Sequence, residues 1–147
     1  MDYGIVIEKI HQELKAYWGK GKVADYIPAL AEVEPKRYGI AIETLDGHSF
    51  QVGDADIRFS IQSISKVFAL AMVTRHLGDR IWKFVGREPS GNPFNSLVQL
   101  EYEHGIPRNP FINAGALVVT DRLMSLYEQP KDAILQFVRS ICGNDDI

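Results

Sequence analysis

One stretch of this sequence alternates in the manner of β-strands, and it limits what the chain can fold into by itself. In RYGIAIETLDGHSFQVGD, residues 37–54, Ile40 and Ile42 alternate with smaller or polar residues, and Asp46-Gly47 is typical of a type I′ turn. The stretch therefore predicts a β-hairpin. A two-stranded sheet is only marginally stable and leaves both edges open, so further strands are expected to complete it.

Helical patterns surround this hairpin. Apolar residues recur at helical spacing after Asp2, a good N-cap, and Gly19 stops them. We expect helices over residues 3–18, 62–77, 113–127 and 130–143, at most one helical turn in YIPALAEVEP (26–35), and a surface loop in GREPSGNPFNSL (86–97). With no internal repeat and no dividing linker, residues 1–147 are expected to form one α+β domain.

The composition narrows the classes of partner. The chain has 147 residues, is 46% hydrophobic and carries a net charge of −3, with its basic residues scattered, so nucleic acid is not an expected partner. No apolar run approaches the roughly 20 residues of a membrane span. The single cysteine, Cys142, cannot form an intramolecular disulfide, and no signal-peptide pattern opens the chain, so we expect a cytoplasmic protein without a membrane partner.

A single charged side chain, Lys66, lies within the apolar run from Ile64 to Val73, three residues after Ser63. A helix places such a pair on one face, with Cβ atoms about 5–6 Å apart. A lysine removed from water by apolar neighbours can accept a serine proton, and a helix N-terminus offers donors to an oxyanion. The Ser-x-x-Lys pattern occurs in acyl-transfer enzymes and predicts a serine nucleophile here.

Structural interpretations stand beside these functional ones. Ser63 could be a helix cap and Lys66 a snorkelling lysine, since a bare Ser-x-x-Lys pair is a weak signal. Tyr26 could simply be packed, and Asn113 could be only a helix cap.

Candidate metal ligands are sparse in the sequence. The four histidines and the lone cysteine lack metal-ligand spacing, so no metal site is expected. Two acidic pairs are expected to be solvated: Asp54 with Asp56, and Glu101 with Glu103 in a loop or extended segment.

Four segments together carry a resemblance to a known family: ADYIPALA, FSIQSISKVF, EPSGNPFNSL and PRNPFINAGALVVTD. In order and spacing they resemble the serine-dependent glutaminases, amidohydrolases with a β-lactamase/transpeptidase-like fold. The resemblance extends over nearly the whole chain. It implies hydrolysis of L-glutamine to L-glutamate and ammonia through an acyl-serine intermediate, without a cofactor, by a homo-oligomer (dimer or tetramer).

The resemblance also implies roles for particular residues. Ser63 would be the nucleophile and an oxyanion contact, and Lys66 its proton acceptor. Tyr26 would lie beside the nucleophile, and Asn113 would bind the substrate. The loop from Ser90 to Ser96 would help to close the site.

Length is the main departure from that family, whose members run to about twice this length. We therefore expect the chain to be the N-terminal portion of a glutaminase domain, with the remaining strands absent and the chain alone inactive. An alternative is a non-catalytic module that self-associates or binds a partner through its open hairpin edge and uncovered apolar faces. Penicillin recognition is a third interpretation, which the other three segments do not favour.

Overall fold

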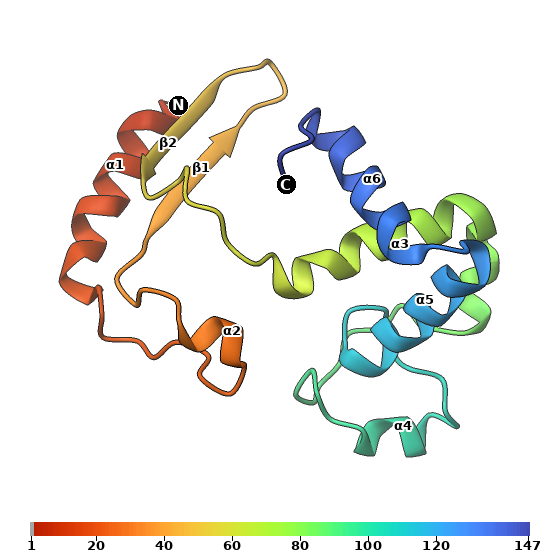
Figure 1. The fold of residues 1–147 in the computed structure, drawn as a ribbon. Coiled ribbons are helices and arrows are strands. Elements are labelled where there is room, and N and C mark those ends of the chain that lie inside the picture. Colours follow the sequence, from red (N-terminus) through yellow and green to blue (C-terminus); the bar gives the residue numbers. More distant parts are fainter. Residues whose placement is uncertain (1) are drawn as a thin grey trace. The chain divides into compact units, whose positions relative to one another are not determined.

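The computed structural model describes residues 2–147; for Gln99 it describes the backbone but not the side chain. The chain divides into two compact units. The first unit ends with Phe59, and the second extends from Ser60 to Ile147. The prediction of one domain over residues 1–147 stays a prediction. Each unit is described by itself below, with the elements labelled in Figure 1.

The first unit begins with helix α1, Tyr3–Leu14, which continues as the 3₁₀ helix η1, Lys15–Tyr17. Asp2 caps α1 as predicted, because its Oδ1 accepts a hydrogen bond from the N–H of Ile5 at 3.2 Å. Helix α2, Pro28–Ala31, is the single turn expected in the proline-containing connector.

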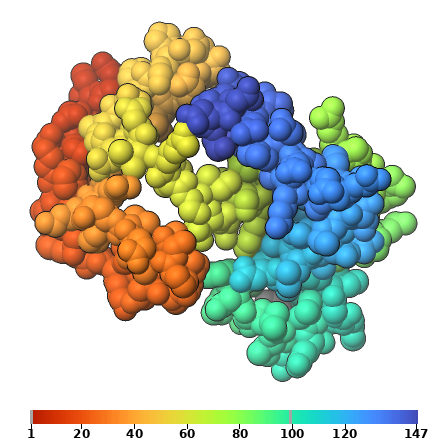
Figure 2. Space-filling model, in the orientation of Figure 1, coloured from red at the N-terminus to blue at the C-terminus, as the bar shows by residue number. Residues whose placement is uncertain are grey.

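The predicted hairpin is confirmed. Strands β1, Gly39–Glu43, and β2, Ser49–Gly53, pair antiparallel, with Ile42 opposite Phe50. They are the only strands among residues 2–147. Helix α1 lies along the hairpin and contacts both strands (Figures 1 and 2).

The predicted type I′ turn is wrong. That turn requires a positive φ at both central residues, whereas Gly47 has φ 84° and Asp46 is not in the left-handed region. The N–H of Gly47 donates to the Thr44 carbonyl at 3.0 Å, which places Leu45 and Asp46 at the centre of the turn. Glycine therefore follows the turn instead of forming its second half.

All regular secondary structure in the described part of the second unit is helical. Its elements are η2, Gln62–Ile64; α3, Ser65–Leu77; η3, Gly78–Lys83; α4, Val98–Tyr102; α5, Asn113–Leu126; and α6, Pro130–Cys142. The predicted helices over 62–77, 113–127 and 130–143 are confirmed, except that the first turn of the first one is a 3₁₀ helix. Gly78 and Gly143 follow α3 and α6 with φ of 54° and 59°, a conformation that favours glycine.

Two short elements, η3 and α4, were not predicted. The expectation of a loop or extended segment at Glu101 and Glu103 is therefore wrong for Glu101, which lies in α4. Four-to-six-residue helical turns carry too little periodicity to be recognised in a sequence.

The hydrophobic core of the second unit forms around α3, which contacts η3, α5 and α6. Its buried members come from α3, the segment after it, and α5: Ala69, Met72, Val73, Ile81, Val85, Val119 and Leu123. Because α3 follows directly from the turn that carries Ser63, the core fixes the helix that presents this residue. No helix among the described residues is both long and apolar enough to cross a membrane.

Candidate active site

Ser63 lies in the 3₁₀ turn η2, immediately before α3. Gln62 has φ 48°, an uncommon value for a residue other than glycine, so the chain bends sharply just before Ser63. Lys66 is the second residue of α3, three residues after Ser63, and this spacing favours the placement of both side chains on one face of a helix. Ser63 is exposed, and among the described residues no acceptor takes a hydrogen bond from its N–H.

The amine of Lys66 is held within the second unit instead of extending to water. Its Nζ donates hydrogen bonds to the Phe111 carbonyl at 2.8 Å and to Asn113 Oδ1 at 2.9 Å. The Phe94 ring centroid lies 5.9 Å from the same nitrogen. The side chain is partly buried, and no carboxylate among the described residues forms an ion pair with it. Two hydrogen bonds to protein acceptors favour a specific role for Lys66 over the snorkelling interpretation.

Asn113 is the first residue of α5, and the interpretation of it as a helix cap is wrong. The N-cap position belongs to Ile112, which makes no side-chain capping bond. Asn113 instead donates its backbone N–H to the Phe94 carbonyl at 2.8 Å and accepts from Lys66. With Oδ1 so used, the Nδ2 donor of Asn113 has no acceptor among the described residues and is available to a ligand.

Tyr26 belongs to the first unit, where it lies in the turn before α2. Its side chain is 80% exposed, so the interpretation of Tyr26 as merely packed is wrong within that unit. The role beside the nucleophile that the resemblance implies for Tyr26 stays a prediction.

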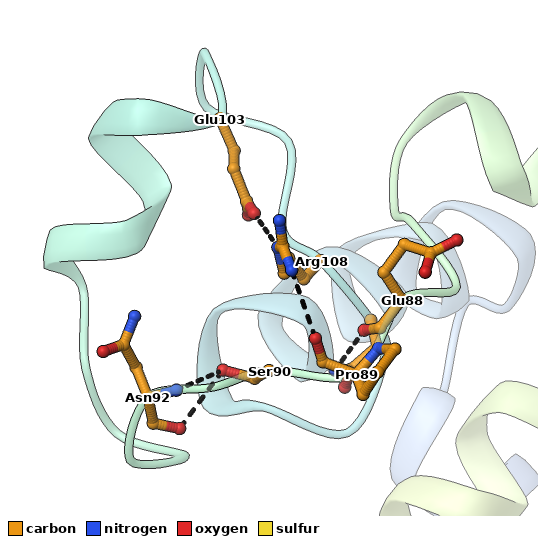
Figure 3. A network of polar contacts seen from close by, with 7 residues as sticks. Glu88, Pro89, Ser90, Asn92, Glu103 and Arg108 are labelled. Carbon is orange, nitrogen blue, oxygen red and sulfur yellow. Dashed lines mark hydrogen bonds and ion pairs between the residues drawn. The ribbon is translucent and has the colours of Figure 1, made fainter.

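The loop before α5 contains a polar network that the sequence interpretation missed (Figure 3). Arg108 forms an ion pair with Glu103, and its Nη1 donates to the Pro89 carbonyl at 3.3 Å. The Glu103 side chain is only 19% exposed, so the expectation that Glu103 is solvated is wrong. Asn109 donates to the Glu88 carbonyl at 3.0 Å. The one available signal was Asn109-Pro110, because asparagine often accepts hydrogen bonds from N–H groups that follow it.

This arrangement provides three of the groups that acyl transfer uses: an exposed hydroxyl, an amine three residues later, and an unused backbone donor at the hydroxyl-bearing residue. Residues 2–147 contain no group of three or more His, Cys, Asp or Glu side chains placed to hold a metal ion.

The model of the glutaminase family matches residues 21–147. The chain belongs to the glutaminase family. A glutaminase of Salmonella arizonae is 58% identical over 143 residues, which are 97% of this chain and 46% of the Salmonella protein. A glutaminase of Salmonella newport matches with the same identity and coverage. This glutaminase-family chain thus spans about half the length of the curated relatives it matches.

Solved glutaminases share the fold, and the chain has the β-lactamase-like fold that was expected. A probable glutaminase, YbaS, superposes with a TM-score of 0.74 at 38% identity, covering 81% of this chain and 39% of YbaS. Mglu in its Tris and glutamate form superposes with a TM-score of 0.73 at 37% identity, covering 91% of this chain and 30% of Mglu. The match is to part of each structure, as the two-stranded sheet led us to expect.

Proposed function

We propose that this chain supplies the nucleophile and proton acceptor of a glutaminase that converts L-glutamine and water into L-glutamate and ammonia. The observation that carries the proposal is the Lys66 amine, held by Phe111 O and Asn113 Oδ1 one helical turn after Ser63. The Salmonella relatives are named glutaminases, and Mglu was crystallised in a glutamate form. Glutamate is the product of the proposed reaction.

In the proposed reaction, the Ser63 hydroxyl attacks the side-chain amide carbon of glutamine while Lys66 takes the hydroxyl proton. A neutral Lys66 can give its two hydrogens to Phe111 O and Asn113 Oδ1, which leaves its lone pair for that proton. The Ser63 N–H stabilises the oxyanion. Lys66 then returns the proton to the departing nitrogen, ammonia leaves, and water hydrolyses the acyl-serine ester to glutamate. No cofactor takes part.

Substrate binding is proposed to involve the Nδ2 donor of Asn113 and the hydroxyl of Tyr26. Charged partners for the α-amino and α-carboxylate groups of glutamine would come from the portion of the relatives that this chain does not span. The second donor to the oxyanion, beside the Ser63 N–H, would come from the same portion. We therefore expect residues 1–147 alone to be inactive, because loss of one oxyanion donor already costs about 10²- to 10³-fold in rate.

The proposal is tested in a chimaera in which residues 1–147 are followed by the second half of the Salmonella arizonae glutaminase. We expect Ser63→Ala to reduce ammonia release by roughly 10³-fold or more. Ser65→Ala is the matched control. The Ser65 hydroxyl donates to the Gln62 carbonyl at 2.7 Å and has no role in the proposed reaction, so the Ser65→Ala variant should keep most activity. Near-normal turnover by Ser63→Ala in an active chimaera would exclude Ser63 as the nucleophile.

A second substitution separates a catalytic from a structural lysine. Lys66→Met keeps much of the side-chain volume and removes a partly buried charge, so the fold should be unharmed or stabilised while acylation fails. A large loss of stability together with retained turnover would favour a structural role for Lys66.

The whole protein is proposed to work in the cytoplasm as a homo-oligomer, a dimer or tetramer. The support for this is the resemblance to the family. Neither a nucleic acid nor a membrane partner is proposed, given the net charge of −3.

A second candidate function for the chain by itself is self-association or partner binding. It is favoured by the two-stranded sheet and by large exposed apolar side chains, such as Phe59 at 75% and Leu117 at 69% exposure. Analytical ultracentrifugation tests for self-association, and urea denaturation tests whether the chain unfolds cooperatively. A monomer that unfolds cooperatively would argue against self-association.

A further inference from the structure

Asn109 has no role in the proposal above, yet its side chain uses both ends of its amide. Its Nδ2 donates to the Glu88 carbonyl at 3.0 Å. Its Oδ1 accepts the N–H groups of Phe111 at 3.0 Å and Ile112 at 3.1 Å. One side chain thus ties the start of the loop over residues 86–97 to the two residues that lead into α5.

These three bonds act on the residues that hold the Lys66 amine. The Phe111 N–H is fixed by Asn109, and the Phe111 carbonyl accepts from Lys66 at 2.8 Å. Ile112 precedes Asn113, which supplies the second acceptor at 2.9 Å. Both acceptors of the amine therefore lie within four residues of Asn109, in a segment whose direction Asn109 sets.

The backbone around Asn109 has little freedom to move. A Cβ added at Gly115 would lie 1.8 Å from the Asn109 carbonyl oxygen, so α5 packs directly against this segment. On its other side, the N–H of Gly86 donates to the Pro107 carbonyl at 2.7 Å, and that of Glu88 donates to the Arg108 carbonyl at 3.0 Å.

The ion pair of Arg108 with Glu103 adds a further tie to the same stretch (Figure 3). The neighbouring prolines, Pro107 and Pro110, are buried. Asn109 therefore lies in a segment that is fixed on both sides, so its hydrogen bonds can transmit a defined geometry.

We propose that Asn109 is a positioning residue: its carboxamide orients Phe111 and Asn113 so that their two acceptors aim the Lys66 amine at Ser63. The catalytic consequence rests on the proposed role of Lys66 as proton acceptor. The geometric consequence does not, since it concerns only contacts of Lys66 within the second unit.

The geometric part is tested on residues 1–147 by competitive acetylation with trace acetic anhydride, followed by mass spectrometry of the lysines. In the unchanged chain, Lys66 should react more slowly than the exposed Lys9, because its amine is hydrogen-bonded twice. We expect Asn109→Ala to raise the relative labelling rate of Lys66 several-fold. The matched control is Asn144→Ala, which also removes an acceptor of a backbone N–H, that of Asp146 at 2.8 Å.

The catalytic part is tested in the chimaera described above. Asn109→Ala should lower kcat by about 10- to 100-fold with KM changed less than about threefold, since a misplacement near 1 Å can cost about 10²-fold. Asn109→Asp loses the donor to the Glu88 carbonyl but keeps an acceptor oxygen for the N–H groups of Phe111 and Ile112, and should recover most of kcat.

Several outcomes would overturn the proposal. One is a Lys66 labelling rate in Asn109→Ala that equals the rate in Asn144→Ala; another is a fall in kcat without a change in labelling. If Asn109→Ala unfolds the chain, the test uses Asn109→Asp instead. Acetylation of Lys66 as fast as that of Lys9 in a folded Asn109→Asp chain overturns the proposal, and acetylation slower than that of Lys9 supports it. If the unchanged chimaera releases no ammonia, the proposed function fails, while the labelling still judges the role of Asn109.

Discussion

The two units differ in how many of their side chains are buried. Among the described residues of the first unit, only Ile7 and His11 are buried, and the Nδ1 atom of His11 has no hydrogen-bond partner. The second unit has a contiguous core, in which Val73 and Ile81 have no exposed surface. The second unit can therefore fix its own side chains by packing, whereas the first presents a helix on a two-stranded sheet with open edges.

This difference matters because Ser63, Lys66 and Asn113 all belong to the second unit. The contact between Lys66 and Asn113 is held by packed helices and by the polar ties around Asn109. The proposed nucleophile and its proposed proton acceptor thus lie on the part of the chain with the better core.

The largest expected effect comes from the core of the second unit. Leu123 is 1% exposed, so Leu123→Ala should cost about 2–5 kcal/mol of unfolding free energy. Native-state hydrogen exchange should show faster exchange in α3 and α5, with the amides of α1 unchanged. Equal loss of protection in α1 would mean that the two units unfold together, and the contrast between them would not hold.

A smaller effect is expected from Gly115→Ala, where the added Cβ would lie 1.8 Å from the Asn109 carbonyl oxygen and 3.0 Å from Pro110 Cα. We expect a cost of about 1–3 kcal/mol, measured by urea denaturation, and faster acetylation of Lys66. Gly91→Ala is the matched control, because no described atom beyond Gly91 and its two chain neighbours lies within 4 Å of its Cβ position. Equal midpoints for the two variants would show that α5 does not press on the Asn109 segment.

The smallest effect is expected in the first unit, at the hairpin turn. The hydroxyl of Thr44, and then the His48 side chain, hold the pKa of Asp46 below 3.8. A lowered pKa contributes stability above pH 3.8, and this contribution is lost as the pH falls through the folded-state value. Asp46→Asn should therefore be slightly less stable than the unchanged chain at pH 6, with the difference vanishing in more acidic solution.

An NMR titration of the Asp46 carboxyl checks this prediction. A midpoint at or above 3.8 would contradict it, because the hydrogen bonds from Thr44 and His48 would then give the carboxylate no advantage.

The sequence predicted the features that local patterns determine. Helical periodicity, the cap at Asp2 and the glycines at 78 and 143 define the long helices, and alternation defines the hairpin. The elements η3 and α4 were missed because they are short. The turn type was wrong because the turn is centred one residue earlier than Asp46-Gly47 suggests.

The site was predictable only in part. Spacing alone indicated Ser63 with Lys66, and the resemblance added Asn113. The contact between Lys66 and Asn113 joins residues 47 apart, so it depends on the packing of α3 against α5. Asn109 was missed because Asn109-Pro110 is only a weak local signal, and its bond to Glu88, 21 residues away, exists only in the folded chain.

The central claim is that this chain carries the nucleophile and proton acceptor of a glutaminase site that the remaining half completes. The most direct measurement compares glutamate formation by residues 1–147 alone with that by the same chain mixed with a separately expressed second half of the Salmonella arizonae glutaminase. We predict no measurable activity in either half, activity in the mixture, and its loss with Ser63→Ala. Glutamate formation by residues 1–147 alone, abolished by Ser63→Ala, would contradict the account, because the site would then be complete within this chain.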